Sequence, residues 1–274
     1  MILVENLIAA VDALHLAERP VMLHASLRSF GTAVDGGADA LLDALLKRGC
    51  TVLAPAFTEP QFGLPAPPDL RPARNGLDYA APPAGSTCQE GVPYRVDCGL
   101  INPRLGVLAA ALVGRAGAVR GRHPLNSFAA VGPRAADLID AQSPDDVYGP
   151  IRELTDHDGR ILLVGVGLNR MTALHLAEQR SGRRLFRRWA RDEDGEIRMV
   201  EVGSCSGGFP RLEPLLAPLA RSTVVGASHW RAYPARQVLA VASAAIAARQ
   251  GITRCPEPGC LLCRDAIAGG PVVS

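Results

Sequence analysis

His175 and Glu178 have the residue types and the spacing of a general base and the carboxylate that orients it. Three positions apart on a helix, their side chains project from the same face. Histidine titrates near neutral pH, so it can take a proton from an attacking amine. A carboxylate on the far ring nitrogen fixes the tautomer and stabilises the cation that forms. The alternative is an ordinary solubilising pair, which spacing alone does not exclude.

A second group of polar residues lies in the segment His24–Gly31, HASLRSFG. Ser26, Arg28 and Ser29 offer hydroxyls, a guanidinium and backbone amides directly after a short apolar run. Phosphate groups are bound by these same elements. The alternative is an ordinary polar connection between two elements of secondary structure.

A third group is the run Arg120–Pro124, followed by Ser127. Because His123 precedes a proline, its backbone must be extended. Its ring either lines a cleft or satisfies a turn, and the sequence does not decide between the two.

Three cysteines near the end of the chain, Cys255, Cys260 and Cys263, form the pattern C-x4-C-x2-C. They could hold zinc with a fourth ligand, such as Cys205 or a histidine. The spacing is not that of a standard ribbon or finger, and a second C-x2-C pair is missing. We therefore expect no metal and favour reduced, partly buried thiols, with zinc at this tail as the alternative.

The element that must position the first pair is the segment Gly159–Glu178. Ile161–Val164 is a continuous apolar run, typical of a strand buried on both faces. A glycine-rich turn follows, and Asn169 or Thr172 can then cap the helix that carries His175. A helix that opens just past the carboxyl end of a strand is where open α/β sheets place their chemistry.

The amino-terminal part predicts a βαβ unit. Val21–His24 and Thr51–Ala54 have the composition of short buried strands, and the leucine-rich helix between them begins near Ala38. Such units usually build parallel sheets, so the fold class is α/β. Further along, Arg184–Arg191 and Glu196–Val202 flank an Asp-Gly turn and predict a hairpin.

Two segments have an unusual composition. Pro55–Gly106 is rich in proline and glycine and shows little periodicity, and a loop of this length is often a binding loop or lid. Arginines crowd positions 183–191. They could form a phosphate or nucleic-acid patch, but aromatic residues are few there and we favour a solvated strand face.

Composition excludes several classes of protein. A net charge of +2 over 274 residues does not argue for binding to nucleic acid or membranes. The first twenty residues lack a basic start followed by an apolar run, and no apolar stretch reaches the length of a membrane span. Seven cysteines, an odd number, do not suggest a secreted disulfide framework. We expect a cytoplasmic protein, monomeric or homodimeric, with reduced thiols.

Four ordered motifs resemble the signatures of the aminoglycoside 3-N-acetyltransferases, a family distinct from the GNAT acetyltransferases. They are VMLHASLRSFG at 21–31, TVLAPAFT at 51–58, VRGRHPLNSFAAVGP at 119–133 and ILLVGVGLNRMTALHLAE at 161–178. The resemblance covers most of the chain. It implies a single domain over 1–274 with a loop-rich insertion at about 55–106. It also implies a mixed, largely parallel central sheet flanked by helices, with a smaller lobe and a long loop region on the acceptor side.

The same resemblance implies acetyl transfer from acetyl-CoA to the 3-amino group of a 2-deoxystreptamine aminoglycoside, and hence antibiotic resistance. His175 would be the general base, Glu178 its acidic partner and Thr172 a neighbour in the pocket. The acetyl-CoA site would be formed by His24, Ser26, Leu27, Arg28, Ser29, Phe30, Gly31 and His123. A polycationic acceptor needs local acids because the whole chain is slightly basic, so we expect it to meet Asp78, Tyr79 and Glu178, with Glu59 as a further candidate.

Two departures from the family pattern stand out: region 55–106 is poorly matched, and Gly121 stands where many relatives have serine. The first leaves the acceptor open, so an acetyl-CoA-dependent N-acyltransferase of another metabolite amine is the nearest alternative. A zinc-dependent interaction module, built on the cysteine tail and the arginine-rich arm, is a rival from a different class. A hydrolase ranks lower because the chain lacks a G-x-S-x-G elbow.

Overall fold

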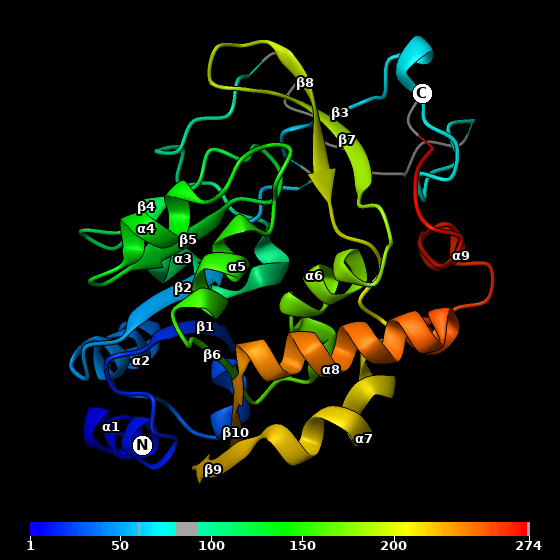
Figure 1. Ribbon diagram of the computed structural model, residues 1–274. Coiled ribbons are helices and arrows are strands. Elements are labelled where there is room, and N and C mark those ends of the chain that lie inside the picture. The colour runs from blue at the N-terminus through cyan, green and yellow to red at the C-terminus, as the bar shows by residue number, and fades with distance from the viewer. Residues whose placement is uncertain (60, 81–91, 273–274) are drawn as a thin grey trace.

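Seven strands form one mixed sheet at the centre of the molecule (Figure 1). The computed structural model describes residues 1–59, 61–80 and 92–272. Across the sheet the strands lie in the order β4 (Val119–Arg120), β5 (Phe128–Val131), β2 (Thr51–Pro55), β1 (Pro20–Ala25), β6 (Arg160–Val164), β10 (Ser228–Pro234) and β9 (Arg221–Val225). The three central strands β2, β1 and β6 are parallel, and the outer pairings are antiparallel.

Side chains alternate between the two faces of this sheet, as the period of two of a strand requires. Met22 packs into the cluster on one face, and its neighbours Val21 and Leu23 pack into the cluster on the other. Both clusters are extensive, so the central parallel strands are buried on both sides. This explains why Ile161–Val164 is continuously apolar.

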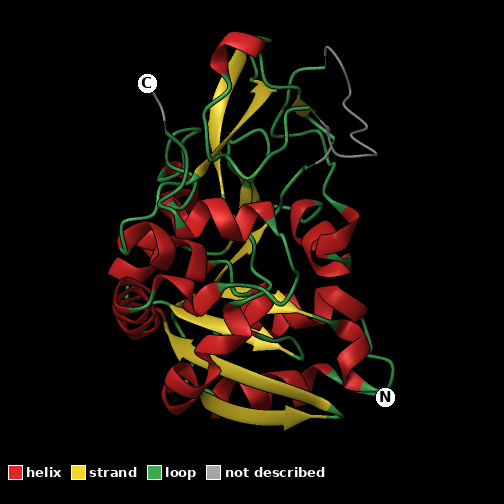
Figure 2. Cartoon of the chain, turned by 90° about the vertical axis from the view of Figure 1, so that its right-hand side faces the viewer, coloured by secondary structure: helices red, strands yellow, loops and turns green. Residues whose placement is uncertain are grey.

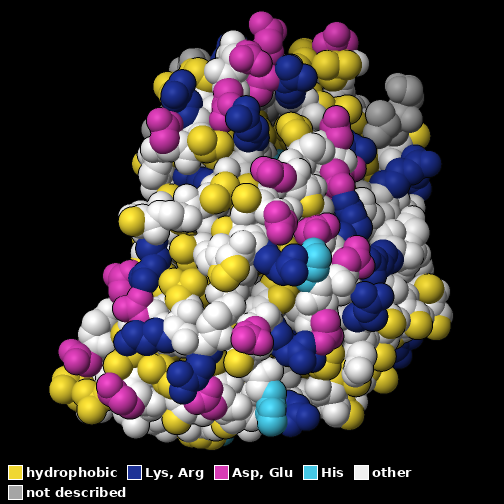
Figure 3. Space-filling view, turned by 60° about the vertical axis from the view of Figure 1, so that its left-hand side comes forward, with side chains coloured by type: hydrophobic (Ala, Val, Ile, Leu, Met, Phe, Trp, Pro, Cys, Tyr) yellow, Lys and Arg dark blue, Asp and Glu magenta, His cyan; other side chains and the backbone are white. Residues whose placement is uncertain are grey.

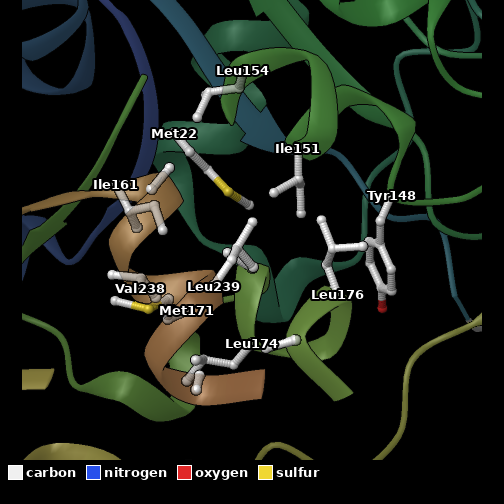
Figure 4. Packing of buried hydrophobic residues seen from close by; sticks show 14 of the residues in the cluster. Met22, Tyr148, Ile151, Leu154, Ile161, Met171, Leu174, Leu176, Val238 and Leu239 are labelled. Carbon is white, nitrogen blue, oxygen red and sulfur yellow. The ribbon is translucent and has the colours of Figure 1, made fainter. Parts of the chain in front are cut away.

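Helices cover both faces and make three layers. The face that Val21 joins is covered by α1 (Val4–Ala13), α2 (Gly37–Leu46) and α3 (Val107–Val113). The face that Met22 joins is covered by α4 (Ala135–Asp140), α5 (Gly149–Asp156), α6 (Ala173–Arg180), α7 (Glu213–Leu216) and α8 (Ala235–Ala248). Figure 4 shows Met22 and Ile161 of the sheet packed against side chains of α5, α6 and α8.

A smaller sheet lies apart from the first, at the top of Figures 1 and 2, and consists of β3 (Gly63–Leu64), β7 (Phe186–Arg191) and β8 (Ile197–Val202). It has a core of its own, in which Phe186 and Val200 pack with Phe62 and Tyr94 from the long loop. The last helix, α9 (Leu261–Ile267), adds Ala266 to that core.

The long segment Pro55–Gly106 contributes β3 and 3-10 turns at Pro68–Leu70 and Pro103–Leu105. Arg120 holds its two ends together. The Nη2 of this buried arginine donates to the carbonyls of Ala56 (2.7 Å) and Leu100 (2.6 Å). Ser127 donates to the same Ala56 carbonyl at 2.8 Å. Arg120 and Ser127 therefore anchor the long segment.

The main sequence expectations for the fold are confirmed, with differences in detail. β1 and β2 pair in parallel with α2 between them, and β7 and β8 form the expected hairpin. The segment Glu213–Ala220 forms α7 followed by a 3-10 turn at Ala217–Leu219, because Pro218 cannot continue the α-helix. Within the described ranges, no helix has the length and apolar character needed to cross a membrane.

Candidate active site

His175 is the third residue of α6, which begins shortly after the carboxyl end of β6. Its Nδ1 lies 2.9 Å from Oε2 of Glu178, one turn further along the helix. Thr172 occupies the N-cap position, but its hydroxyl makes no capping hydrogen bond. The structure thus brings the two residues of the predicted pair into direct contact.

Glu178 accepts four hydrogen bonds although its side chain is almost fully buried. Ser204 donates to Oε2 at 2.7 Å, together with His175. Arg183 and Thr253 donate to Oε1, the latter at 3.2 Å. Each oxygen of the carboxylate therefore has two donors.

These contacts keep Glu178 ionised. Burial raises the pKa of this carboxyl, but the hydrogen bond and charge of His175 and the charge of Arg183 outweigh it, and the net pKa lies below its ordinary value. An ionised carboxylate can only accept, so His175 donates from Nδ1. When the imidazole is neutral, the lone pair on Nε2 is then available to a substrate.

Packing fixes the plane of the His175 ring. Tyr148 stacks on it, with ring centroids 6.2 Å apart and an interplanar angle of 10°. Phe209 approaches from another side at 4.7 Å. A Cβ at Gly203 would lie 3.0 Å from Cδ2 of the imidazole, so only glycine leaves room for the ring there.

His175 and Thr172 line a cavity of about 780 Å³ at the carboxyl ends of the parallel strands. His24 and the segment 26–28 line it from the end of β1, and Asn102–Gly106 lines it from the long loop. The charged lining residues are three arginines, Arg28, Arg104 and Arg170; among the described residues that line it there is no Asp or Glu. The cavity is therefore suited to an anion.

His24 contributes a neutral ring to this cavity. Burial, followed by the positive charge of Arg170, lowers the pKa of His24 to about 3. Its Nε2 is buried and has no hydrogen-bond partner in the described part of the chain. A ligand group that fills the cavity could supply one.

Three residues of the predicted acetyl-CoA segment lie behind the cavity wall rather than on it. Ser29 donates to the carbonyl of Ser26 at 2.6 Å and pairs with Ser228. Phe30 is buried edge-on against Trp230. Gly31 has a φ of 71°, which ends the 3-10 turn Leu27–Phe30 in a left-handed conformation. These residues shape the turn that presents Ser26–Arg28.

His123, also predicted at the acetyl-CoA site, is not among the residues that line the cavity and is fully buried. Nε2 donates to the carbonyl of Glu201 at 2.8 Å, while Nδ1 accepts from the backbone amides of Leu125 and Asn126. Burial lowers the pKa of His123 to about 4. Both ring nitrogens are used, so the geometry corresponds to the turn interpretation and leaves no contact for a ligand.

The predicted acceptor residues Asp78 and Tyr79 do not line the cavity either. Asp78 accepts from the amide of Ala80, while the Tyr79 hydroxyl donates to the carbonyl of Pro72 and accepts from Asn75. The structure brings neither residue to His175.

The phenol of Tyr148, whose ring stacks on His175, is affected by the charge of three carboxylates. Burial raises the pKa of this phenol well above its usual range, and the negative charges of Glu178, Glu201 and Glu59 add to the effect. This acidic neighbourhood of Tyr148 also contains arginines: Arg187 pairs with Glu201 at 3.0 Å, and the charge of Arg188 acts on Glu59.

Arg183 is the site residue that the sequence did not assign. The solvated strand face favoured for positions 183–191 does not describe it, because only 4% of Arg183 is exposed. Besides Glu178, its guanidinium binds Thr253 and the side chain of Gln250. Its position five residues after Glu178 was the only feature of the sequence that could have indicated this contact. Thr253 and Ser204 had none, since they reach Glu178 from remote segments.

Comparison with known sequences gives one family. The sequence model of the aminoglycoside 3-N-acetyltransferases matches residues 22–247. Aminoglycoside N(3)-acetyltransferase IX of Micromonospora chalcea is 33% identical over 165 residues, which cover 58% of this chain and 54% of the relative. Aminoglycoside N(3)-acetyltransferase VIII of Streptomyces fradiae is 34% identical over 169 residues, covering 59% and 54%. These alignments span about half the length of each relative.

Solved structures show the same fold over nearly the whole chain. Aminoglycoside acetyltransferase AAC(3)-IVa, as the apoenzyme, superposes with a TM-score of 0.75 at 24% identity and covers 98% of this chain and 97% of its own. AAC-IIIb in a binary complex with CoASH superposes with a TM-score of 0.72 at 23% identity, covering 90% and 96%.

Proposed function

Because the chain belongs to the aminoglycoside 3-N-acetyltransferase family, we propose that it transfers an acetyl group from acetyl-CoA to the 3-amino group of a 2-deoxystreptamine aminoglycoside. The observation that carries the proposal is an imidazole on the wall of a large cavity, with Nδ1 held by a buried carboxylate. Similar folds have been solved with CoASH and with a gentamicin. Anionic CoASH suits the arginine-lined cavity, and a cationic gentamicin suits the acids that act on Tyr148.

The arginine-lined cavity is the acyl-donor side. Coenzyme A carries a diphosphate and a further phosphate, and Arg28, Arg104 and Arg170 supply positive charge without a competing carboxylate in the described lining. The turn Leu27–Phe30 adds backbone amides and the hydroxyl of Ser26. All three guanidinium groups lie on exposed residues, so they can reach a ligand at the mouth of the cavity.

His175 is the proton acceptor in this proposal. The acceptor amine attacks the thioester carbonyl carbon, the C–N bond forms, and Nε2 of His175 takes the amine proton. The imidazolium is stabilised by ionised Glu178, which in turn is held by Arg183, Ser204 and Thr253. When the C–S bond breaks, the thiolate leaves and takes up one proton, so the products are the N-acetylated amine and free thiol.

The oxygen of the attacked carbonyl gains negative charge before the C–S bond breaks. Thr172 lines the cavity next to His175, and its hydroxyl makes no capping bond within α6. That hydroxyl, or a backbone amide of the segment 24–30, can donate to the developing oxyanion. Removal of one such donor typically costs roughly 10²–10³-fold in kcat.

The acidic neighbourhood of Tyr148 is the acceptor side. Burial raises the pKa of Glu59 and of Glu201, which means that desolvation disfavours their charge. Arg187 already pairs with Glu201 at 3.0 Å and the charge of Arg188 acts on Glu59, so a cationic amine would add to these partners. On the face drawn in Figure 3, acidic side chains are interspersed with Lys and Arg over the upper and central parts. The drawn face has no large acidic patch among its described residues, and in this proposal the local acids supply the selectivity for a polycation.

The test is a free-thiol release assay with acetyl-CoA and a panel of aminoglycosides, with the acetylated position identified by NMR. The chain should be active on aminoglycosides with a free 3-amino group. His175→Ala should lower kcat by roughly 10²–10⁴-fold while the Kd for coenzyme A stays the same. His157→Ala is the matched control, because His157 pairs with Glu153 on the surface of α5 and does not line the cavity.

Three results would contradict the proposal in different ways. Equal turnover by the His175→Ala and wild-type enzymes would exclude the general-base role. Acetylation of other amines, with no reaction on any aminoglycoside, would exclude the acceptor and leave the donor site and the mechanism standing. Failure to bind coenzyme A would exclude acetyl transfer altogether.

A further inference from the structure

The fold brings four cysteines together outside the cavity. The Sγ atoms of Cys205, Cys255, Cys260 and Cys263 all lie within 4.8 Å of one another. Cys255, Cys260 and Cys263 come from the tail pattern, and Cys205 comes from the loop that follows β8. Cys263 lies on α9, which is red in Figure 1. The sequence lacks a second C-x2-C pair, and the fourth thiol of the cluster comes instead from Cys205, far away in sequence.

The spacing of the four sulfurs is close to that of a tetrathiolate metal centre. With zinc–sulfur bonds of about 2.3 Å, the edges of the sulfur tetrahedron are about 3.8 Å long. A limit of 4.8 Å on every pair therefore requires only a small contraction around a central ion. Two of the four residues, Cys255 and Cys263, are buried.

The backbone around the cluster is arranged to hold thiolates. The amide of Gly207 donates to Sγ of Cys205 at 3.4 Å, and the amide of Cys255 donates to Sγ of Cys263 at 3.3 Å. Such donors stabilise negative charge on sulfur and fix its orientation. Gly259, with a φ of 76°, turns the chain immediately before Cys260.

Close packing joins the two segments that carry the thiols. A Cβ at Gly207 would lie 3.0 Å from Cβ of Cys255, and a Cβ at Gly208 would overlap the carbonyl of Thr253. The loop at 205–208 can therefore approach 253–255 this closely only because glycine occupies both positions. The close approach is what brings Cys205 to the tail.

We propose that Cys205, Cys255, Cys260 and Cys263 bind one zinc ion in a closed, structural site. Four thiolates in a tetrahedral arrangement select zinc among the common divalent cations, and four protein ligands leave no open position for a substrate. The site is thus separate from the acetyl-transfer chemistry. Its existence does not depend on which amine the enzyme acetylates.

The ion would stabilise the groups that hold Glu178. Ser204, which donates to Oε2, directly precedes Cys205, and Thr253, which donates to Oε1, lies two residues before Cys255. Metal bonds at the two cysteines fix the backbone beside both donors. Loss of zinc should therefore loosen the support of the carboxylate even though the ion touches no substrate.

The direct test is elemental analysis of the whole chain, purified under reducing conditions and without added metal or chelator. We expect about one zinc per chain. Cys260→Ser, which changes a partly exposed member of the cluster, should lower the zinc content at least fivefold, while Cys98→Ser, outside the cluster, should leave it unchanged. Cobalt uptake by reduced, metal-free protein should give the thiolate-to-cobalt charge-transfer bands of a tetrahedral site.

These measurements remain decisive if a variant fails to fold, because two of them use the wild-type chain. Absence of metal in the purified protein, together with failure of the reduced protein to take up zinc or cobalt, would overturn the proposal. So would mass spectrometry that shows disulfides among these four cysteines in the freshly isolated protein. Zinc content and acetyl transfer are measured separately, so failure of one does not imply failure of the other.

Discussion

Replacing Glu178 by glutamine removes one negative charge from a buried side chain that accepts four hydrogen bonds. The substitution keeps the shape and one acceptor oxygen, so the cavity wall should remain intact. It leaves the Arg183 guanidinium, which is 4% exposed, without a counter-charge. Breaking a buried ion pair from one side typically costs about 3–5 kcal/mol in unfolding free energy. The remaining amide oxygen can still accept from Arg183, so we expect a cost near 3 kcal/mol.

The catalytic effect should be larger than the effect on stability explains. The neutral amide of the Glu178→Gln variant can no longer neutralise an imidazolium at His175, and kcat should fall roughly 10²–10⁴-fold. Urea unfolding gives the loss of stability, and thiol release at saturating substrates gives kcat. Measuring both on the same preparations separates loss of folded enzyme from loss of chemistry.

Two further variants make this prediction specific. Glu153→Gln changes the same kind of histidine–glutamate pair on the surface of α5 and should cost less than about 0.5 kcal/mol, with no change in kcat. Combining Glu178→Gln with Arg183→Met removes the unpaired charge, so it should restore at least about 1 kcal/mol of stability without restoring kcat. A folded Glu178→Gln enzyme with kcat within threefold of wild type would refute the assigned role of the carboxylate.

The stability of the fold should fall in acid through His123, whose ordinary pKa of 6.5 is lowered to about 4 by burial. Between these values the unfolded chain binds the extra proton and the folded chain does not, so the free energy of unfolding begins to fall below pH 6.5 and has lost about 2 kcal/mol at pH 5. Urea unfolding at pH 7 and pH 5 should show a smaller difference in unfolding free energy for His123→Gln than for wild type. An equal difference would contradict the assignment. Gly121→Ala should destabilise by about 1–3 kcal/mol in thermal unfolding, because the added Cβ would overlap the hydrogen-bonded amide of Gln142. Gly251→Ala, where a Cβ meets no atom, is its control, and equal melting temperatures would count against that packing. Arg170→Ala should raise the KM for acetyl-CoA roughly fivefold, which corresponds to about 1 kcal/mol, and the effect should be smaller at high salt. The KM for the aminoglycoside should not change. An increase only in the KM for the aminoglycoside would assign the cavity to that substrate.

Local sequence patterns were sufficient to predict the elements whose structure depends on neighbouring residues. The apolar run Ile161–Val164, the Asp-Gly turn of the hairpin and the i, i+3 spacing of His175 and Glu178 all depend on residues close in sequence. The β1–α2–β2 unit follows the same logic, because its handedness and pairing are properties of short crossover connections.

The rest of the site depends on contacts that no local pattern encodes. Thr253 reaches Glu178 across 75 positions of sequence, and Ser204 reaches it across 26. The family resemblance assigned His123 to the acetyl-CoA site, but its ring completes the hydrogen bonding of a turn and a strand. Only the packed structure distinguishes a buried ring with both nitrogens occupied from one with a free nitrogen.

Arg120 has a consequence for how this fold accommodates sequence change. It holds the start and the end of the long segment through the main-chain oxygens of positions 56 and 100. Every amino acid has such an oxygen, so the clamp places no demand on which residues occupy those two positions. Substitution at either position therefore keeps both hydrogen bonds. The closure of the long segment, whose residues 102–106 line the cavity, is thus insensitive to the side chains at the points where it is held.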